Sequence, residues 1–362
     1  MESPLISVII PVYNSGKKLN HCLRSLLSQT YQCFEIILVD DKSTDLKTLQ
    51  IEDDWLKEDK RIRIFRNTVN GEHEPRLWGV RQSHGTYICF SDQDDWLPKN
   101  SLEVMLTEAV EKDLDVAIGQ ISKVVKIGPF SKEFPQKQNM DLIGKVIEQK
   151  DLMEHYYHSY FGWNILPVTV WGKLYRRSLF QRADQDLEYA FRFKNDASDL
   201  LMSMALHPHI KRLCVIDDVV YSYFIGTPGV SPKYLKTWLP MSCDLFRYKW
   251  EMLDRYNFRS AERLLAFEMI NYIKSFVSIC TIYEQENRDA HINVLANVLQ
   301  DPIWEKVGVL KIHNVKDLGI VNMILQKDSN GIFEKEERKI LDAPFVKRLK
   351  YSIMRSTVKW KS

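Results

Sequence analysis

Short, almost uniformly apolar runs alternate with amphipathic segments through the first third of the chain. Such apolar runs are typical of strands buried on both faces, and the amphipathic segments have apolar residues at helical spacing. The predicted strands are residues 5–12, 34–39, 61–66, 85–90 and 115–121, and the predicted helices are residues 18–29, 46–57, 77–83 and 101–112. This alternation predicts an α/β fold with a mostly parallel mixed sheet and flanking helices.

The pattern changes in the second half of the chain. Residues 122–150 are charged and irregular, which is typical of a surface loop or hairpin, and a helix is expected after Ser198. From about Ser231 the sequence predicts long amphipathic helices, at residues 234–256, 260–283 and 291–299. We therefore expect an α/β domain over residues 1–228 and an α-helical domain over residues 229–362, with the boundary near Thr227-Pro228-Gly229.

Composition limits the class of protein. The chain has 362 residues, which is enough for about two domains, and its net charge of +2 gives no general attraction to nucleic acid. The six cysteines are scattered and lie mostly in apolar runs, so reduced thiols are expected. No secretory signal opens the sequence, and no continuous apolar run reaches the roughly 18 residues that a membrane span needs. We expect a cytoplasmic protein.

The segment 344–362 differs from the rest because it is basic and has no acidic residue. Phe345, Leu349 and Ile353 are spaced four apart, as on one face of a helix, and Trp360 lies near the end. The basic positions are Lys347, Arg348, Lys350, Arg355, Lys359 and Lys361. One hypothesis is an interfacial helix on anionic lipid, which would make the protein peripheral on the inner face of the cell membrane. The other is a basic tail without a membrane role.

Acidic residues follow two of the predicted strands. Asp40 and Asp41 come after residues 34–39, and the sequence Asp92-Gln93-Asp94-Asp95 follows residues 85–90. If these strands are parallel, both clusters face one crevice at the carboxyl edge of the sheet. Carboxylate oxygens suit Mg²⁺ or Mn²⁺, which often share their coordination with a substrate phosphate. The alternative for a short acidic triplet is a solvated turn.

The same crevice would suit a nucleotide. Tyr13, just past the first strand, would offer an aromatic face to a base. The sequence has neither a Walker-type nor a Rossmann-type glycine-rich phosphate loop, so we expect a metal and side chains to handle the phosphate charge.

Four ordered motifs resemble those of family 2 glycosyltransferases. They are residues 7–14 (SVIIPVYN), 26–31 (LLSQTY), 34–41 (FEIILVDD) and the D-x-D at 92–94. Residues 170–180 (VWGKLYRRSLF) are similar to the bacterial branch that builds surface polysaccharides. The resemblance covers roughly residues 5–225. It implies a Rossmann-like GT-A catalytic domain, a nucleotide-sugar donor, a divalent cation (Mn²⁺ or Mg²⁺) and inversion at the anomeric carbon.

The resemblance also implies roles for individual donor-site residues. Asp41 would hydrogen-bond the base, most simply uracil, with Pro11 and Tyr13 beside it. Asp92 would contact the ribose or the metal, and Asp94 would coordinate the metal. Two readings of Arg76 remain open, a contact to the diphosphate or aspartates and a structural salt bridge.

The resemblance also implies a general base, which is a carboxylate at the start of a helix, some way before a strand with the sequence V-I-D. Asp199 matches this spacing ahead of Val215-Ile216-Asp217, and Asp196 is the second candidate. A helix N-terminus favours the ionised carboxylate that a base requires. The alternative for Asp199 is a helix-capping role only.

Several positions depart from the family pattern. Lys42 replaces a glycine in D-D-G-S-T-D, Leu77 replaces an asparagine after Arg76, and Ser198 replaces a glutamate before Asp199. These departures bear on donor geometry and leave the reaction class unchanged. Three tryptophans are candidates for stacking on an acceptor sugar, with a place in the core or in a pocket wall as the alternative: Trp96, Trp163 and Trp171.

Together these patterns predict an inverting, metal-dependent glycosyltransferase. It would move a sugar from a nucleotide-sugar donor, most simply a UDP-sugar, to a hydroxyl of a glycan or lipid-linked acceptor in surface-polysaccharide biosynthesis. The alternative hypothesis is a catalytically degenerate member of the same fold that binds nucleotide or acts as a scaffold. The sugar, the acceptor hydroxyl and the oligomeric state do not follow from the sequence.

Overall fold

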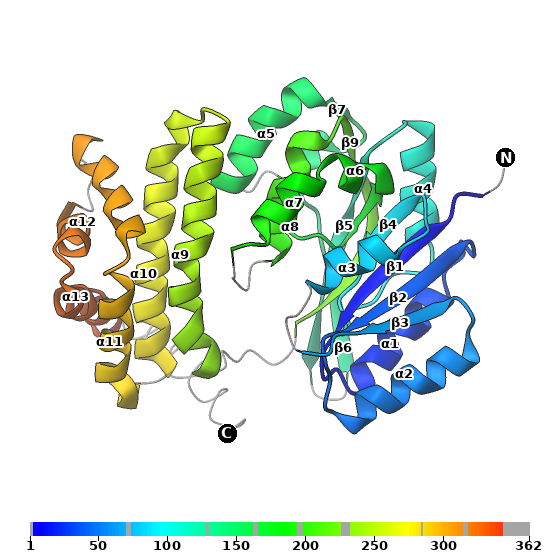
Figure 1. Ribbon diagram of the computed structural model, residues 1–362, viewed down its shortest axis with the longest axis horizontal. Helices are drawn as coiled ribbons and strands as arrows, with labels where there is room; N and C mark the ends of the chain where they lie inside the picture. The colour runs from blue at the N-terminus through cyan, green and yellow to red at the C-terminus, as the bar shows by residue number, and fades with distance from the viewer. Residues whose placement is uncertain are drawn as a thin grey trace. The chain divides into compact units, whose positions relative to one another are not determined.

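The computed structural model describes residues 3–69, 74–127, 130–161, 166–193, 198–225, 232–283, 285–313 and 318–342 (Figure 1). Contacts within the chain divide it into two units. The α/β unit comprises Met1–Tyr156, Ile165–Phe191 and Asp199–Gly226, and the helical unit comprises Tyr157–Asn164, Arg192–Ser198 and Thr227–Ser362. The predicted boundary at Thr227-Pro228-Gly229 and the basic tail both lie outside the described residues.

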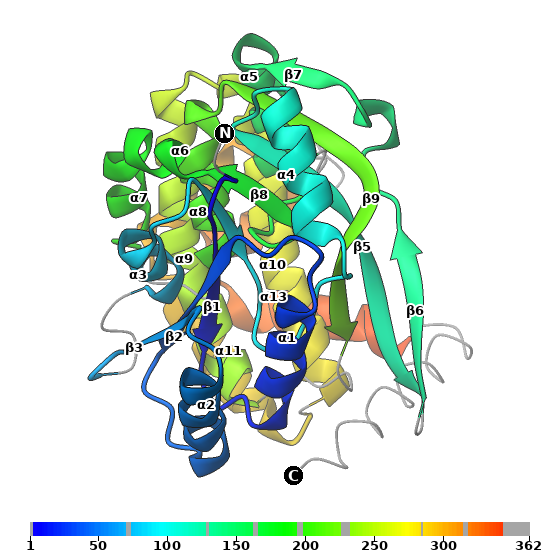
Figure 2. The same ribbon diagram turned by 90° about the vertical axis from the view of Figure 1, so that its right-hand side faces the viewer.

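The α/β unit is built on one nine-stranded sheet, of which the first four strands run parallel. These strands lie in the order β3-β2-β1-β4, so β2 and β3 follow β1 on one side and β4 lies on its other side. Figure 2 shows β3, β2 and β1 next to one another. Their bounds are β1 Ile6–Val12, β2 Phe34–Asp40, β3 Ile62–Arg66 and β4 Tyr87–Phe90. All seven residues of β2 are buried, which explains the apolar run from Ile36 to Val39.

The remaining strands make the sheet mixed. β8 (Lys173–Arg176) runs antiparallel between β4 and β5 (Val116–Ile127), and β9 (Arg212–Ile225) runs parallel to β5. β7 (Val146–Glu148) and β6 (Phe130–Gln136) add antiparallel pairings to β9 and β5. β5 and β6 pair antiparallel, from Ile121 with Gln136 to Ile127 with Phe130, which agrees with the hairpin, one of the two forms expected for residues 122–150. β8 was not predicted as a strand, because its four residues are too few to show a period.

Helices cover both faces of this sheet. α1 (Lys17–Leu27), α2 (Leu46–Glu58) and α4 (Ser101–Glu111) share a buried cluster with the even-numbered residues of β1. α3 (Pro75–Gln82) packs on the other face, where a Cβ at Gly79 would lie 2.4 Å from Ile9 Cγ2. Glycine at this position lets α3 approach the sheet closely.

The other helices of the α/β unit follow in the second half of its chain. They are α5 (Gln149–Phe161), which continues into the helical unit, α6 (Arg177–Arg182), α7 (Asp184–Ala190) and α8 (Ser198–Leu206). Short 3-10 turns occur at Met140–Leu142, His207–His209, Arg259–Ala261 and Gln285–Asn287.

The helical unit is centred on α10 (Glu262–Tyr283), which contacts α9 (Pro232–Arg255), α11 (Arg288–Val298), α13 (Ser329–Leu341) and η5 (Pro302–His313). α12 (Leu318–Leu325) packs on α13 and η5. The helical stretch Arg259–Tyr283 is long and apolar enough to cross a membrane, and 56% of its most apolar window is buried in the structure. The contacts of α10 on several sides are those of the central helix of a bundle.

Candidate active site

Three parallel strands end side by side at the edge of the sheet where the acidic residues lie. Val12 at the end of β1 is paired with Asp40 at the end of β2, and Ile9 of β1 is paired with Phe90 at the end of β4. The loops that follow these strands therefore meet at one carboxyl edge, as the sequence pattern predicted.

Side-chain amides tie the three loops together. Asn14 Oδ1 in the first loop accepts hydrogen bonds from the backbone N–H groups of Thr44 (2.8 Å) and Asp45 (2.9 Å) in the second loop. Gln93 in the third loop accepts from Tyr13 N (2.8 Å) and donates to Tyr13 O (3.1 Å), so one side-chain amide pairs with both backbone groups of one residue. These bonds hold the backbone around the crevice in one arrangement.

A pocket of about 330 Å³ opens between these loops and α3. It is lined by Pro11, Val12, Tyr13, Asp41, Pro75, Arg76, Asp92, Gln93 and Asp94. The structure thus brings together the donor-site residues predicted from sequence and the predicted metal ligand Asp94. Tyr13 is 49% exposed, as a residue offering its ring to a ligand must be, and Asp41 Oδ1 accepts a hydrogen bond from Asn67 Nδ2 at 2.7 Å.

Arg76 connects this pocket to Asp199. Its Nη2 lies 2.6 Å from Asp92 Oδ1 and 3.3 Å from Asp199 Oδ1, and its Nη1 lies 3.9 Å from Glu74 Oε1. Burial alone would lower the pKa of Arg76, but the surrounding carboxylates, Asp199 foremost, raise it above its usual value. Three carboxylates around one guanidinium leave excess negative charge in the cluster, which favours a cation nearby.

Burial has the opposite consequence for two of these carboxyls. It raises the pKa of Asp92 and of Glu74 above their ordinary values, while Arg76 opposes the rise at both. Glu74 also caps α3, since its Oε2 accepts a hydrogen bond from Leu77 N at 2.6 Å. Glu74 therefore fixes the helix that carries Arg76.

Asp94 lies at the open side of the pocket. Its side chain is 36% exposed, and its Oδ2 lies 2.9 Å from Lys18 Nζ. Among the described residues no group of three His, Cys, Asp or Glu side chains is placed to hold a metal ion. Asp92 and Asp94 nevertheless line one pocket with hard oxygen donors, and Mg²⁺ commonly takes one or two carboxylates and completes its shell with substrate phosphate. The pair fits a cation shared with a diphosphate.

Asp95 has a structural position, unlike its two neighbours. Its side chain points into the protein, where Oδ2 accepts from the Tyr221 hydroxyl (2.8 Å) and Oδ1 accepts from Phe224 N (2.7 Å). The Tyr221 hydroxyl also accepts from Asp92 N at 2.9 Å. Burial raises the pKa of Asp95 to about 7. Asp95 thus fastens the acidic loop to β9 and holds Asp92 and Asp94 toward the pocket.

Asp199 lies in the first turn of α8, with its side chain 26% exposed. Its Oδ2 accepts a hydrogen bond of 3.5 Å from Val170 N, in the segment that precedes β8. The alternative base, Asp196, lies outside the described residues.

The candidate acceptor tryptophans have different surroundings. Trp171 stacks on Tyr221 and Tyr223 of β9, with ring centroids 4.6 and 5.4 Å apart. Trp96 packs edge-on against His21 at 4.6 Å. Tyr223 is 37% exposed, so the aromatic cluster around Trp171 reaches the surface. Trp163 lies outside the described residues.

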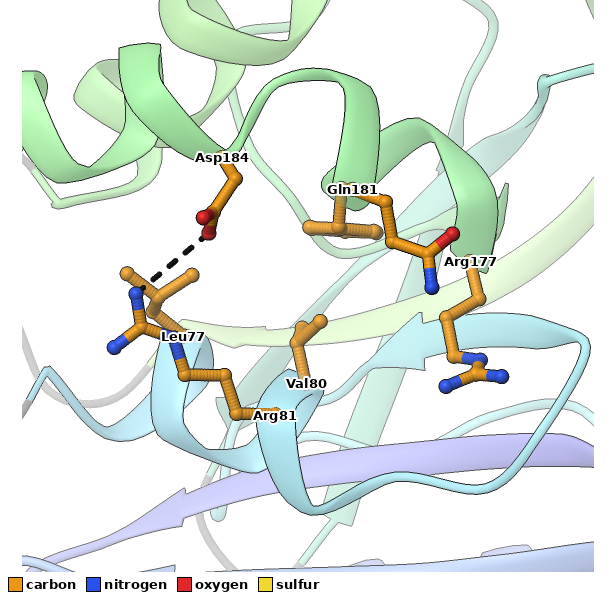
Figure 3. Close-up of a pocket in the computed structure, with 7 residues that line it drawn as sticks. Leu77, Val80, Arg81, Arg177, Gln181 and Asp184 are labelled. Atoms are coloured by element: carbon orange, nitrogen blue, oxygen red, sulfur yellow. Dashed lines mark ion pairs between the residues drawn. The ribbon is translucent and has the colours of Figure 1, made fainter.

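A second pocket, of about 420 Å³, lies between α3 and the helices α6 and α7 (Figure 3). It is lined by Leu77, Val80, Arg81, Arg177, Phe180, Gln181 and Asp184. Arg81 reaches across it to Asp184 at 3.7 Å and also pairs with Glu188 at 2.9 Å. None of the predicted site residues lines this pocket, so we place the chemistry in the smaller one.

Sequence reasoning missed four residues that shape the site: Lys18, Asn67, Glu74 and Gln93. Asn67 had a readable signal, because it follows the predicted third strand and so belongs to the same sheet edge. Gln93 lies inside the D-x-D itself. Lys18 and Glu74 contribute through contacts that no local sequence pattern predicts.

The sequence of this chain is similar to a protein family and to several known proteins. Residues 7–183 match the family model for glycosyl transferase family 2. The chain is 30% identical over 220 residues to the uncharacterized glycosyltransferase EpsJ of Bacillus subtilis, covering 61% of each protein. It is 42% identical over 118 residues to the glycosyltransferase GlyG of Streptococcus pneumoniae, covering 32% of this chain and 39% of that protein.

A more distant relative has a specified activity in its name. The poly(ribitol-phosphate) beta-glucosyltransferase of Bacillus spizizenii is 29% identical over 228 residues, which are 62% of this chain and 33% of that protein. The chain therefore spans less than two thirds of the length of each of these curated relatives.

Among solved structures, the chain is similar to S. aureus TarS 1-349 in complex with UDP-GlcNAc. The TM-score is 0.59 at 22% identity, over 92% of this chain and 90% of that one. A second crystal structure of the same protein, in complex with UDP, matches equally well, over 94% and 92% of the two chains. At this identity the likeness shows the fold, which is the GT-A fold predicted from the motifs.

Proposed function

Since this chain belongs to glycosyltransferase family 2, we propose that it transfers a sugar from a nucleotide-sugar donor to a hydroxyl of a surface glycan or a lipid-linked acceptor, with inversion at the anomeric carbon. The observation that carries the proposal is Arg76, which joins a carboxylate of the donor pocket, Asp92, to the candidate base Asp199. A uridine diphosphate sugar is the proposed donor.

Two kinds of contact support a nucleoside in the smaller pocket. Tyr13 offers an exposed ring, and the Asp41 carboxylate, fixed by Asn67, can accept hydrogen bonds from the N–H group of a pyrimidine base. The names of the TarS complexes, with UDP-GlcNAc and with UDP, describe ligands of the same class on the same fold. Uracil is our proposal for the base because Asp41 accepts and does not donate.

Asp92 and Asp94 are the residues proposed to hold a divalent cation. When bound, such an ion supplies a Lewis acid that stabilises the charge developing on the leaving diphosphate. The two carboxylates would hold the cation in the pocket, and the buried bonds of Asp95 keep the loop that carries them from shifting. Arg76 adds a positive charge that is fixed at the side of Asp92.

Asp199 is the proposed general base. It would take the proton of the acceptor hydroxyl as that oxygen bonds to the anomeric carbon and the bond to the diphosphate breaks. Its Oδ2 accepts a hydrogen bond from Val170 N and its Oδ1 is paired with Arg76, so the side chain is held on two sides beside the donor pocket. A base opposite the leaving group gives inversion.

The experiment that tests the reaction class is a panel of nucleotide-sugars incubated with the full chain, with and without Mn²⁺, reading the release of nucleoside diphosphate. We expect UDP release from one donor, abolished by chelator. Release that continues in excess chelator would contradict metal dependence. Release of a different nucleoside diphosphate would contradict the uridine donor and keep the reaction class.

The second candidate is a degenerate family member that binds nucleotide without catalysis. Leu77 and Ser198, which replace polar residues of the family pattern, favour it, and the intact Asp92, Asp94 and Asp199 oppose it. Metal-dependent hydrolysis of the donor without an acceptor separates the two, because only a catalyst releases the sugar. Binding of UDP and Mn²⁺ with no turnover of any donor would favour the degenerate member.

We further propose a cytoplasmic protein that is peripheral on the inner face of the membrane, because the segment 344–362 carries six basic residues and no acidic one. Vesicle flotation tests this with the full chain and a chain ending at residue 343. The full chain should bind vesicles that contain anionic lipid more strongly than the shorter one. Equal binding would remove the membrane role from this segment.

A further inference from the structure

Lys173 of β8 is a buried lysine whose ammonium group faces backbone oxygens. The residue is 5% exposed, and its Nζ donates hydrogen bonds of 2.6 Å to both Pro167 O and Thr169 O. Within the described residues it forms no ion pair. Burial lowers its pKa to about 7, against which Asp199 acts in the opposite direction. Burying such a side chain costs free energy, and the two hydrogen bonds offset part of that cost. The burial of Lys173 therefore calls for a physical reason.

The segment that Lys173 binds, residues 167–170, is held at each of its four carbonyl oxygens. Between the two bonds from Lys173, Val168 O accepts from Ser203 Oγ at 2.7 Å. The last carbonyl, Val170 O, accepts from the Tyr175 hydroxyl at 3.2 Å. This segment (the clamped segment) therefore has little freedom to move relative to β8 and α8.

Among the described residues, the side chain that accepts a hydrogen bond from a backbone N–H of the clamped segment is that of Asp199. Val170 N donates to Asp199 Oδ2, and Ser203 lies one helical turn after Asp199 on α8. A connected path thus runs from the sheet through Lys173 to the clamped segment, and from there to the carboxylate proposed as the base.

We propose that Lys173 is a positioning residue for the glycosyl transfer: by fixing the clamped segment it sets the place and direction of the Asp199 carboxylate. This inference rests on the proposed function, in which Asp199 is the base. A methionine of similar length would fill the same space without burying a charge, and it would leave Pro167 O and Thr169 O without a donor. Lys173 acts through Asp199 and does not need to touch substrate.

The test compares Lys173→Met with the wild-type protein at saturating donor and acceptor. Because a displacement of about 1 Å at a reacting group can lower a rate by up to about 100-fold, we expect kcat to fall about 10-fold or more in the variant. The KM for the donor and the Kd for UDP should change less than about twofold, since the donor pocket does not include Lys173. If the role of Lys173 were purely structural, the variant would yield less folded protein, and the folded part would not show a lower kcat at an unchanged KM.

Two further variants keep the test decisive if Lys173→Met fails to fold. Ser203→Ala removes another bond of the clamped segment and should lower kcat in the same direction by a smaller factor. Gln120→Leu is the control, because it removes a buried side-chain bond to Ile216 O in the same unit without touching the clamped segment. This control should lower the melting temperature and keep the wild-type kcat.

Hydrogen exchange of the Val170 amide gives a readout that does not depend on turnover. It should be faster in Lys173→Met and in Asp199→Asn than in the wild type, because each variant loosens the bond between Val170 and residue 199. Wild-type kcat in folded Lys173→Met and in Ser203→Ala, with unchanged Val170 exchange, would overturn the positioning role. An inactive wild-type chain contradicts the proposed function instead, and in that case the exchange data still decide whether Lys173 holds the segment.

Discussion

Arg76 shows how one side chain can serve the donor pocket and the base at once. Its guanidinium is 13% exposed and lies within 4 Å of three carboxylates, those of Glu74, Asp92 and Asp199. Removing Arg76 would leave buried negative charges without a partner, which is more costly than losing one exposed ion pair. In the structure the contact of Arg76 with the aspartates is itself a salt bridge, and the contact to a diphosphate that the sequence also allowed stays a prediction.

If Asp199 is the general base, its replacement should lower the rate of sugar transfer and leave the affinity for UDP nearly unchanged. Asp199→Asn keeps the shape of the side chain and removes the proton acceptor, so transfer should fall by about 10³-fold. UDP binding should weaken by less than about threefold, because Asp199 does not line the donor pocket. Transfer rates and UDP calorimetry on the same preparation check this. Asp217→Asn, at an exposed aspartate paired with Lys137, is the matched control and should keep the wild-type rate.

Glu52 gives a prediction of stability against pH. Its side chain has no exposed surface, and burial, assisted by Asp40, raises its pKa from 4.5 to about 7 although Arg66 Nη2 lies 2.8 Å from its Oε2. Between pH 4.5 and about 7 the folded state then binds more protons than the unfolded state. The free energy of unfolding should therefore fall as the pH rises through this window, by at most roughly 3 kcal/mol from this group.

Glu52→Gln should remove that part of the pH dependence. Urea unfolding at pH 5 and pH 8 measures it: the wild type should lose more stability between the two conditions than the variant does. Glu111→Gln, at an exposed glutamate at the end of α4, should behave as the wild type. Parallel stability curves for the wild type and Glu52→Gln would contradict the prediction.

At the residue scale the sequence was informative where a motif and a strand end coincided. Tyr13, Asp41, Asp92 and Asp94 could be placed at one sheet edge because each follows an apolar strand. The contact of Arg76 with Asp199 could not be foreseen, since the two residues are far apart in the chain and no local pattern fixes their distance. Trp163 and Asp196 stay predictions.

α3 is the element that joins the fold to the site. Its Gly79 packs on Ile9 of β1, its N-terminal cap is Glu74, and its first turn carries Arg76. The eight-residue helix has apolar residues on no single stripe, so its position depends on this close approach and less on amphipathicity. The Arg76 guanidinium can therefore reach Asp92 only if the helix lies tightly on the sheet.

Gly79→Ala tests this dependence. The added Cβ would lie 2.4 Å from Ile9 Cγ2 and 3.3 Å from Val39 Cγ2, so α3 must shift outward. We expect a loss of about 1–3 kcal/mol in the free energy of unfolding and weaker UDP binding. Gly308→Ala is the control, because its Cβ would meet no atom closer than 4.0 Å. Unchanged stability and UDP affinity in Gly79→Ala would contradict the account of α3.

Among the elements, the strands β3, β2, β1 and β4 were predictable, as was β5, and the short antiparallel strands β7 and β8 were not. β1 and β2 are long apolar runs, and their observed bounds differ from the predicted ones by a residue or so. β7 has three residues and β8 has four, which is too short for a strand period, and their places are set by pairing with distant strands. β8 nevertheless carries Lys173, so the least predictable strand supports the proposed base.

At the scale of the whole molecule, the donor pocket and Asp199 lie within the α/β unit. The helical unit has its own buried core around α10, and the described residues that line the donor pocket all belong to the α/β unit. The residues that match the family model, 7–183, include all those that line the donor pocket. Asp199 lies beyond the end of this match. Residues after position 183 could therefore contribute to the choice of acceptor.

The central claim is that Asp92 and Asp94 bind a nucleoside diphosphate together with a divalent cation. The measurement that tests it most directly is calorimetry of UDP with the full chain, with and without Mn²⁺, for the wild type and Asp94→Ala. We predict that Mn²⁺ tightens UDP binding to the wild type by at least about tenfold, and that Asp94→Ala loses this gain while staying folded. Binding of UDP that is indifferent to Mn²⁺ in the wild type, or equally Mn²⁺-dependent in Asp94→Ala, would contradict the account.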